Sequence, residues 1–525
     1  MNFIKSLIFA LFCALSFSAC ASMGDIATLE VLYYDGKNVE DSYSYAKKYA
    51  DDDFLWALQS GILAYQLGES TNANEYLNGA EVFFEGTSGE NAFNGGFKSF
   101  ASIIISNGMF EYNGAFYESV FVNHYKALNA IMTGDFQSAR VEFNRANDRQ
   151  RRAKDYFSDY ISKRDESISE SKGEYGEKTQ SVDLDKSYEK ATSIYGAHYQ
   201  NLRRFKAFEG YVNPYISYIS GIFFLAQKDY TKAQNLLKES YAITNNKAIL
   251  QDIAILEKRK RDLVAEGGKF YTWIIIEEGR IPKKEEIRFD LPLFFLNAGV
   301  LSFNIALPVL RESYAYSTNY NVKYTQDSIG RSILDEKSGL RSHEQGNKTD
   351  SLWLLRYARK SCGLTKRVAS LPDLSLKDKP IKAFEIADIS PLVANEFNIE
   401  LPYIITTALL SSSYKAYLQY ALSENLGFLG ALGGAIFSHF STNADIRSVR
   451  ILPLRFYALR IPNENGDFAL HNGSYKLRDF TFEMDNCTNL CAKSDNIIYL
   501  RIVQNDIISV LIHSLNKEQN NEYID

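Results

Sequence analysis

The residues with the most distinctive chemistry in this chain are two closely spaced cysteines, Cys487 and Cys491. They enclose Thr488-Asn489-Leu490 between two strand-like segments, and Asp485-Asn486 and Asn489 favour a turn there. A disulfide between them would close a tight loop, which an oxidising compartment permits. Zinc binding is the weaker alternative, because a structural zinc site needs four ligands and no paired histidine motif accompanies them. Cys362 would then remain as a free thiol.

Cys20 ends a short N-terminal leader. Lys5 precedes an apolar run over residues 7–15, and Phe17-Ser18-Ala19 places small residues before the cysteine. This pattern is typical of a bacterial lipoprotein signal, so we expect residues 1–19 to be removed and Cys20 to carry the lipid. The following Ala21-Ser22 lacks an inner-membrane retention aspartate, which favours a periplasm-facing anchor in the outer membrane. A plain secretory signal ending near Ala19 or Ala21 is the alternative.

No familiar catalytic pattern accompanies these cysteines. The sequence contains no G-x-x-x-x-G-K phosphate loop, no H-E-x-x-H and no G-x-S-x-G. None of its 6 histidines has a neighbour at ligand spacing. Glu277 and Glu278 are adjacent at a strand end, so their side chains should point to opposite faces. We therefore predict no metal, no cofactor and no enzymatic activity.

The net charge of the chain argues against nucleic-acid binding. The chain carries a formal net charge of -6, which becomes -7 when the leader takes Lys5 away. Nucleic-acid-binding proteins usually present a basic face, so a nucleic-acid partner is not expected. After the leader, no apolar run reaches the roughly 18 residues that a membrane span needs.

The N-terminal half is predicted to be helical and repeated. Small and large apolar residues recur with spacings of 3, 4, 5, 4 and 3 residues in three segments, which begin at Gly61, Ala127 and Gly221. This resembles the tetratricopeptide repeat, a helix–turn–helix unit of about 34 residues. We assign residues 20–50 to a tether and residues 51–265 to this domain, with a charged helical insertion at 147–206. An ordinary helical bundle is the alternative.

The C-terminal half, residues 266–516, reads as a mixed domain with a largely antiparallel sheet, followed by a polar tail at 517–525. Short β-branched segments such as 271–276, 449–459 and 497–503 predict strands, and residues 401–421 predict a helix. The glycine-rich segment 425–437 is either tightly packed core or an element that inserts into a membrane or binds a partner. The fold class is thus α+β.

Asp445 and Arg447 are the best polar candidates in this half. They precede an apolar strand, where a charged pair commonly fixes register, so a structural role is favoured over a ligand role.

Several phrases, taken in order, resemble a poorly characterised family of bacterial lipoproteins with tetratricopeptide-like repeats. They span most of residues 50–465 and include Val141-Glu142-Phe143-Asn144-Arg145-Ala146, Glu278-Gly279-Arg280-Ile281-Pro282-Lys283 and Ala444-Asp445-Ile446-Arg447. The resemblance implies no enzymatic activity and, by association only, a role in the cell envelope.

These observations predict a scaffold that is anchored to the membrane through Cys20 and binds envelope protein partners through its helical repeats. Two rivals stay open. One is an enzyme acting on peptidoglycan or carbohydrate through the C-terminal domain, and the other is a structural subunit of an envelope machine.

Overall fold

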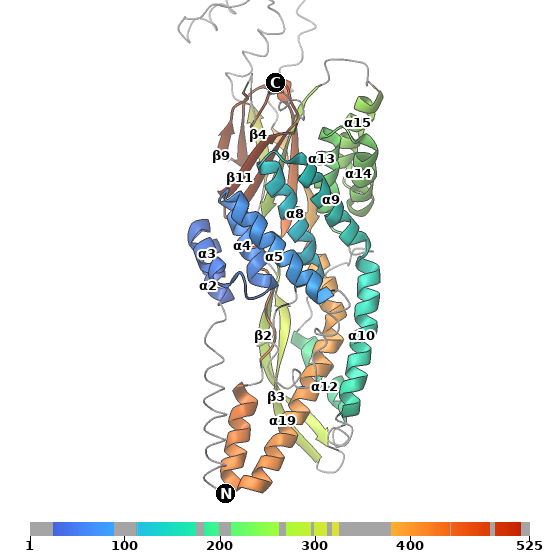
Figure 1. The fold of residues 1–525 in the computed structure, drawn as a ribbon, viewed down its shortest axis with the longest axis vertical. Coiled ribbons are helices and arrows are strands. Elements are labelled where there is room, and N and C mark those ends of the chain that lie inside the picture. The colour runs from blue at the N-terminus through green and yellow to red at the C-terminus, as the bar shows by residue number, and fades with distance from the viewer. Residues whose placement is uncertain are drawn as a thin grey trace, which may run out of the picture.

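The computed structural model describes residues 25–88, 112, 114–174, 183–198, 212–261, 269–295, 299–311, 318–324, 380–440, 443–483 and 489–515. Helices fill the N-terminal half of this part and antiparallel sheets most of the C-terminal half, as the α+β prediction requires. Figure 1 shows helices on one side of the sheets, with a long extension toward the lower end of the view.

Three helix hairpins form the helical part of the fold beside the sheets. They are α4–α5 (Phe54–Gln66 and Ser70–Ser88), α8–α9 (Phe116–Met132 and Phe136–Arg151) and α13–α14 (Pro214–Ala226 and Tyr230–Thr244), and α15 (Lys247–Arg261) packs beside α14.

All three hairpins turn in the same way. Gly68, Gly134 and Lys228 adopt left-handed backbone conformations with φ of 78°, 75° and 61°. In each turn, the N–H of the next residue donates to the carbonyl five residues back at 2.9 Å, as Asp135 does to Ala130. This pairing satisfies a carbonyl at the end of the first helix. The next residue is also the N-cap of the second helix in the α8–α9 and α13–α14 hairpins.

The first helix of each hairpin is buried on every side. All residues of α13 are buried, as are those from Phe54 to Tyr65 in α4 and from Phe116 to Ile131 in α8. Helices that are apolar all round occupy the interior of a protein. Here the second helices cover one side of them and a sheet covers the other.

That sheet has five strands in the order β11-β10-β1-β7-β6. The strands are β1 (Tyr271–Glu278), β6 (Phe384–Asp388), β7 (Arg455–Pro462), β10 (Asn496–Val503) and β11 (Asp506–Ser514). β1 and β10 pair in parallel and the other neighbours pair antiparallel.

A second sheet covers the opposite face of the first. Its order is β5-β4-β8-β9, from Ile381–Lys382, Tyr320–Tyr324, Phe468–Asn472 and Tyr475–Phe480. Alternate residues of β1 serve the two interfaces: Trp273 and Ile275 face the helices, whereas Ile274 and Ile276 face the second sheet. One core therefore joins the helical half to the sheets.

The predicted strand over 449–459 begins later than expected. β7 starts at Arg455, and residues 449–454 are buried but irregular. Pro453 has no N–H to donate to a ladder, which explains the late start. The segment still bonds to its neighbours, because Leu454 N donates to Glu278 O at 2.9 Å and Ile281 N donates to Leu452 O at 3.2 Å.

Residues 25–50 are folded rather than extended. They form α2 (Ile26–Glu30), a π-helical turn at Val31–Asp35, α3 (Val39–Ala46) and a 3-10 turn at Lys47–Tyr49. Leu29, Tyr33 and Tyr34 are buried in the main core. The hydroxyls of Tyr33 and Tyr34 each accept from Arg501 of β10 at 3.3 Å. Any tether within the described part of the chain is therefore shorter than the sequence suggested.

The extension consists of β2 (Lys283–Phe295), β3 (Gly299–Arg311), α10 (Ala153–Glu174), α12 (Leu184–His198) and α19 (Ser390–Phe440). The charged insertion predicted at 147–206 supplies α10 and α12, which pack against α19 and β2. Tyr195 of α12 donates to Pro308 O of β3 at 2.6 Å. Figure 1 shows these elements running together away from the sheets.

Candidate functional site

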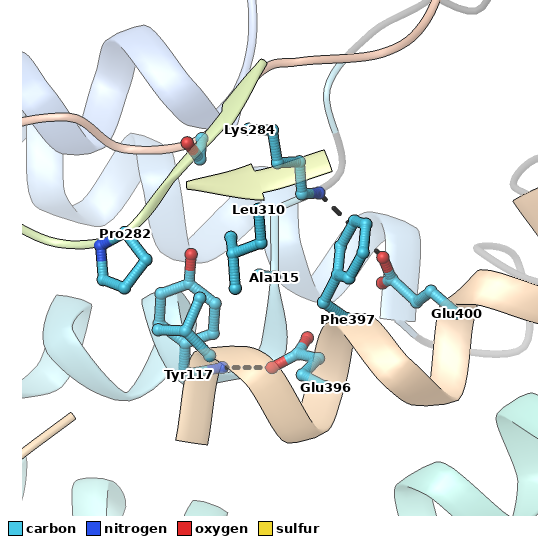
Figure 2. A pocket seen from close by; sticks show the side chains of 10 residues that line it. Ala115, Tyr117, Pro282, Lys284, Leu310, Glu396, Phe397 and Glu400 are labelled. Carbon is cyan, nitrogen blue, oxygen red and sulfur yellow. Dashed lines mark hydrogen bonds and ion pairs between the residues drawn. The ribbon is translucent and has the colours of Figure 1, made fainter. Parts of the chain in front are cut away.

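A small pocket lies where the start of α8, the first turns of α19 and the body-side end of the β2–β3 hairpin meet (Figure 2). It encloses about 270 Å³ of empty space, part of which is open solvent. Its lining combines apolar side chains with a few polar ones: Ala115, Tyr117, Pro282, Lys284, Leu310, Val393, Glu396, Phe397, Glu400 and Ser448.

Glu396 fastens α19 to the start of α8. Its Oε1 accepts from Phe116 N at 2.5 Å and its Oε2 accepts from Tyr117 N at 3.1 Å. The first N–H groups of a helix have no partner within the helix and carry partial positive charge, so a carboxylate is well placed there. Figure 2 shows Glu396 directed at Tyr117 across the pocket floor.

Glu118 supports the same helix end from inside. Its carboxylate accepts from Ala115 N at 2.9 Å, from Val449 N at 2.8 Å and from the hydroxyl of Tyr112 at 2.8 Å. The side chain thereby connects α8 to the irregular segment before β7. Both oxygens are committed to holding the fold.

Burial is the largest influence on the pKa values of the two acidic side chains in the pocket. Burial, and then the charge of Glu400, raise the pKa of Glu396 to about 8, against the effect of its two backbone donors. Burial also raises the pKa of Glu400, and the charge of Lys284 opposes this rise. The Lys284 Nζ lies 4.0 Å from Glu400 Oε2, and the Glu400 side chain is still 25% exposed. Glu400 is thus the more accessible acid.

The chemical capacity of this pocket follows from that arrangement. Residues at i and i+4 of a helix are neighbours, so α19 places two carboxyl groups side by side. A pair in which one acid is protonated near neutral pH could hold a cation or exchange a proton. However, Glu396 uses both oxygens on backbone donors, which leaves only Glu400 free to meet a ligand together with Lys284.

Asp445 and Arg447 form a two-pronged ion pair. Arg447 Nε lies 3.0 Å from Asp445 Oδ1, and its Nη2 lies 2.9 Å from Oδ2. The Arg447 guanidinium also lies 5.3 Å from the centre of the Tyr112 ring and 3.9 Å from Asp53, the N-cap of α4. Although burial opposes it, Arg447 lowers the pKa of Asp445. The pair joins α4 to the segment before β7, which is a structural task.

A second polar cluster is sealed between α8, α13 and the five-stranded sheet. His124 Nε2 lies 2.9 Å from Tyr499 Oη and 3.0 Å from Tyr215 Oη. Tyr499 and Tyr125 donate to Glu277 Oε1 at 2.5 and 3.0 Å. Burial lowers the pKa of His124 to about 3 and raises that of Glu277. These hydrogen bonds connect the helices to the sheet, and they leave His124 Nδ1 buried without a hydrogen-bond partner.

Glu277 and Glu278 point to opposite faces of the sheet, as expected. Glu277 lies on the helical side, whereas the charge of Glu278 acts on Tyr320 and Tyr457 on the side of the second sheet. They do not form a shared acid–base pair.

The cysteine predictions are only partly visible. Cys491 is disulfide-bonded. Cys20, Cys362 and Cys487 lie outside the described residues, so the Cys487–Cys491 pairing and the lipidation of Cys20 stay predictions. Within the described ranges, no group of three or more His, Cys, Asp or Glu side chains is arranged to hold a metal ion. The helices described there include none long and apolar enough to cross a membrane.

Sequence reasoning missed Glu396 and Glu400, although a signal was present. They are the only charged residues between positions 390 and 414, within a largely apolar helix. Like charges four residues apart destabilise a helix, so their presence indicates a tertiary partner.

Comparison with protein-family models, with curated proteins and with solved structures gives no match to this chain. The site is therefore interpreted from its own geometry.

Proposed function

We propose that this protein is a membrane-anchored scaffold that holds a protein partner on its helical layer, in the assembly of the bacterial cell envelope. Lipidated Cys20 is its anchor, and the outer membrane, on its periplasmic side, is the proposed location. The observation that carries the proposal is the set of three helix hairpins with equivalent turns. Tetratricopeptide-like arrays of such hairpins bind proteins and peptides.

The available binding surface is the layer formed by α5, α9 and α14. The five-stranded sheet covers the first helices of the hairpins, so these are not available to a partner. The outer helices remain accessible, and Val82 and Val141 are 70% and 47% exposed on them. A partner is therefore expected to contact α5 and α9 from outside.

Ion pairs hold this outer layer in a fixed shape. Lys126 Nζ lies 2.6 Å from Glu81 Oε2 of α5 and 3.2 Å from Glu142 Oε1 of α9. Arg140 of α9 lies 2.9 Å from Asp229 Oδ2 in the turn before α14. Such a rigid, polar layer with scattered apolar side chains suits protein recognition better than chemistry.

Crosslinking in intact cells followed by mass spectrometry tests the scaffold proposal. Val82→Glu and Val141→Glu should remove one envelope partner from the crosslinked set, because each adds a charge to the proposed contact. Thr71→Glu, on the exposed face of α5 near its start, is the matched control. If the wild-type chain yields no reproducible envelope partner, the scaffold function is wrong.

The anchor has its own test. Cys20→Ser should leave an unprocessed precursor or a soluble chain, because the thiol that receives the lipid is gone. Cell fractionation and the mass of the mature N-terminus report both outcomes. Processed Cys20→Ser protein that stays in the membrane as the wild type does would contradict lipidation.

The pocket favours one alternative, an enzyme acting on peptidoglycan or another carbohydrate. Glycoside hydrolases use two carboxyl groups, one of them with a raised pKa, and the pKa values of Glu396 and Glu400 are both raised by burial. Because backbone N–H groups occupy both oxygens of Glu396, Glu400 is the acid that would act on a substrate. Loss of a glycan-cleaving activity in Glu400→Gln would support this alternative, and retention of that activity would exclude it.

A further inference from the structure

β11 forms one edge of the five-stranded sheet, and among the described strands it pairs with β10 alone. Figure 1 shows it on the side of the sheets away from α14 and α15. An edge strand presents a row of backbone N–H and C=O groups that can pair with another chain. Proteins normally protect such an edge with charged side chains, with proline or with a covering segment.

Two residues of β11 direct their backbone polar groups away from the sheet. Leu515 N donates to Asp495 O at 2.7 Å, so this pair lies at a hydrogen-bonded position of the ladder. Opposed residues in an antiparallel pair alternate between bonded and non-bonded positions. Counted back through the regular register from Ser514, Val510 and Ile512 therefore occupy non-bonded positions. Their N–H and C=O groups point outward from the edge.

The described part of the chain does not cover these outward groups. Within it, no hydrogen bond from a side chain or from backbone outside the sheet reaches Val510 or Ile512. Both side chains are half-buried and pack against the core between the two sheets. Solvent therefore reaches the edge, although its side chains are apolar.

The composition of β11 gives this edge no protection. No residue from Ile507 to Ser514 is proline, and none is an acid, a lysine or an arginine. The one carboxylate of the strand, Asp506, is neutralised by Lys37, whose Nζ lies 2.5 Å from Asp506 Oδ2. Segments rich in apolar, β-branched residues with little charge and no proline pair readily with other strands.

Two other sheet edges of the described fold do carry such protection. β9, at the edge of the second sheet, has three exposed charged side chains, Lys476, Arg478 and Asp479. β6, at the far edge of the five-stranded sheet, has its Glu385 carbonyl occupied by Asn246 Nδ2 at 2.7 Å. The contrast indicates that pairing with another chain is opposed at those edges and permitted at β11.

We propose that the edge is occupied by β11 of a second copy of this chain, so that the two five-stranded sheets become one continuous sheet across a two-fold axis. Antiparallel pairing centred on Leu511 places Val510 of one copy opposite Ile512 of the other. Each such pair of outward-facing residues can exchange two hydrogen bonds. This register keeps the overlap within residues 509–513, beyond the β-bulge at Ile508 that interrupts the pairing with β10.

The charges of the strand make a second copy a fitting occupant. In this register the Asp506 carboxylates of the two copies lie about 30 Å apart, because each is five residues of extended strand from the axis. Charges at that separation are screened in physiological salt, whose Debye length is about 8 Å. The opposed side chains near the axis are apolar, and such cross-strand pairs stabilise a sheet. A two-fold pairing also uses the edge completely, which gives a closed dimer.

Light scattering over a dilution series tests the proposal without the anchor, on the mature chain with Cys20→Ser. This parent chain should have the mass of a dimer. Val510→Pro should raise the dissociation constant of the dimer about tenfold or more, because one intermolecular hydrogen bond from each copy is lost. Proline removes only the outward N–H of an edge strand, so the pairing with β10 should survive, which circular dichroism checks. Val510→Thr keeps the N–H and the branched shape, and it should dimerise as the parent chain does.

Ser509→Lys tests the same edge without proline. Ser509 is half-buried, and a lysine on an edge strand opposes pairing with another chain. The long lysine side chain can reach water from the free edge of a single copy, so the fold should tolerate it. This variant should be monomeric. Ser158→Lys, the same substitution at an exposed position of α10, is the matched control and should remain a dimer.

An engineered disulfide tests the register. Leu511 would lie on the two-fold axis at a non-bonded position of the new pairing, where opposed Cα atoms are about 4.5 Å apart. This separation lies within the range that a disulfide spans, so Leu511→Cys should give a covalent dimer on mild oxidation. In Ser509→Cys the two equivalent Cα atoms would be about 13 Å apart, which is too far for a disulfide. The parent chain, which retains Cys362, gives the baseline.

A parent chain that stays monomeric at every concentration would overturn the proposal, as would equal dimerisation of the parent, Val510→Pro and Ser509→Lys. A monomeric parent whose crosslinked partner in intact cells is lost in Val510→Pro would instead assign the edge to a different protein. Because light scattering needs neither the anchor nor an envelope partner, it is independent of the scaffold test. Failure of the scaffold proposal would leave the dimer intact, and absence of the dimer would leave the effects of Val82→Glu and Val141→Glu unchanged.

Discussion

Gly61→Ala tests whether close helix approach is what builds the hairpins. A Cβ at position 61 would lie 2.6 Å from Leu77 Cγ, 2.8 Å from Leu77 Cδ2 and 3.1 Å from Leu77 N. Carbon atoms in contact are normally about 3.5–4.0 Å apart, so the new methyl intrudes by about 1 Å. Leu77 is fully buried and its backbone is part of α5, so α4 and α5 must separate.

The magnitude follows from two opposing effects. Overpacking a core costs about 1–3 kcal/mol. Replacing glycine by alanine inside a helix contributes about 1 kcal/mol in the other direction. We therefore expect Gly61→Ala to lower the free energy of unfolding by up to about 2 kcal/mol.

Gly79→Ala in α5 is the matched control, because no atom lies within 4 Å of the Cβ it would add. It should raise the free energy of unfolding by about 0.5–1 kcal/mol. The assay is urea unfolding of the mature chain with Cys20→Ser. The free energies of unfolding of the variants are compared once their dependence on urea concentration (the m-value) has been found equal. If Gly61→Ala stabilises the chain as much as Gly79→Ala does, the reasoning from close approach is refuted.

Two further predictions concern the turn and the pocket. Lys228→Gly should raise the free energy of unfolding by about 0.5–1 kcal/mol. A left-handed conformation costs a residue with a side chain about 1–2 kcal/mol, and the greater freedom of glycine in the unfolded chain cancels part of the stabilisation. An unchanged urea midpoint would contradict this prediction. The raised pKa of Glu396 means that the folded state favours its protonated form, so its contribution to stability is complete below the pKa of the unfolded chain and is lost as pH rises toward about 8. Melting temperatures measured from pH 5 to 8.5 should therefore fall less in Glu396→Gln than in the wild type, whereas Glu75→Gln at an exposed site should follow the wild type.

Local sequence patterns predicted the hairpins because their determinants are local. Small residues at fixed spacing and a left-handed turn depend only on neighbouring residues, so the turns at Gly68 and Gly134 lie where the spacing of small residues predicted a break between helices. Even Lys228, which departs from the glycine pattern, keeps the same turn. The prediction of strands at 271–276 and 497–503 succeeded for the same reason.

The partners of these elements could not be predicted in the same way. Nothing local indicates that β1 pairs in parallel with β10, or that a sheet covers the first helices of the hairpins. One signal was available in retrospect: Pro214–Ala226 is apolar on all sides, and such a helix requires cover on both faces. The pocket depends on α19 meeting α8, a contact between residues 280 positions apart.

The pairing of β1 with β10 has a consequence for how the chain matures. Thr272 lies opposite Asn496, and Arg501 of the same strand binds Tyr33 and Tyr34 near the start of the fold. The central sheet stays incomplete until the last segment of the polypeptide has been delivered, and contacts of such sequence separation form slowly. Until then, the apolar helices would wait uncovered for that segment. Chaperones that hold unfolded chains should therefore be as important to this protein's yield as its own stability.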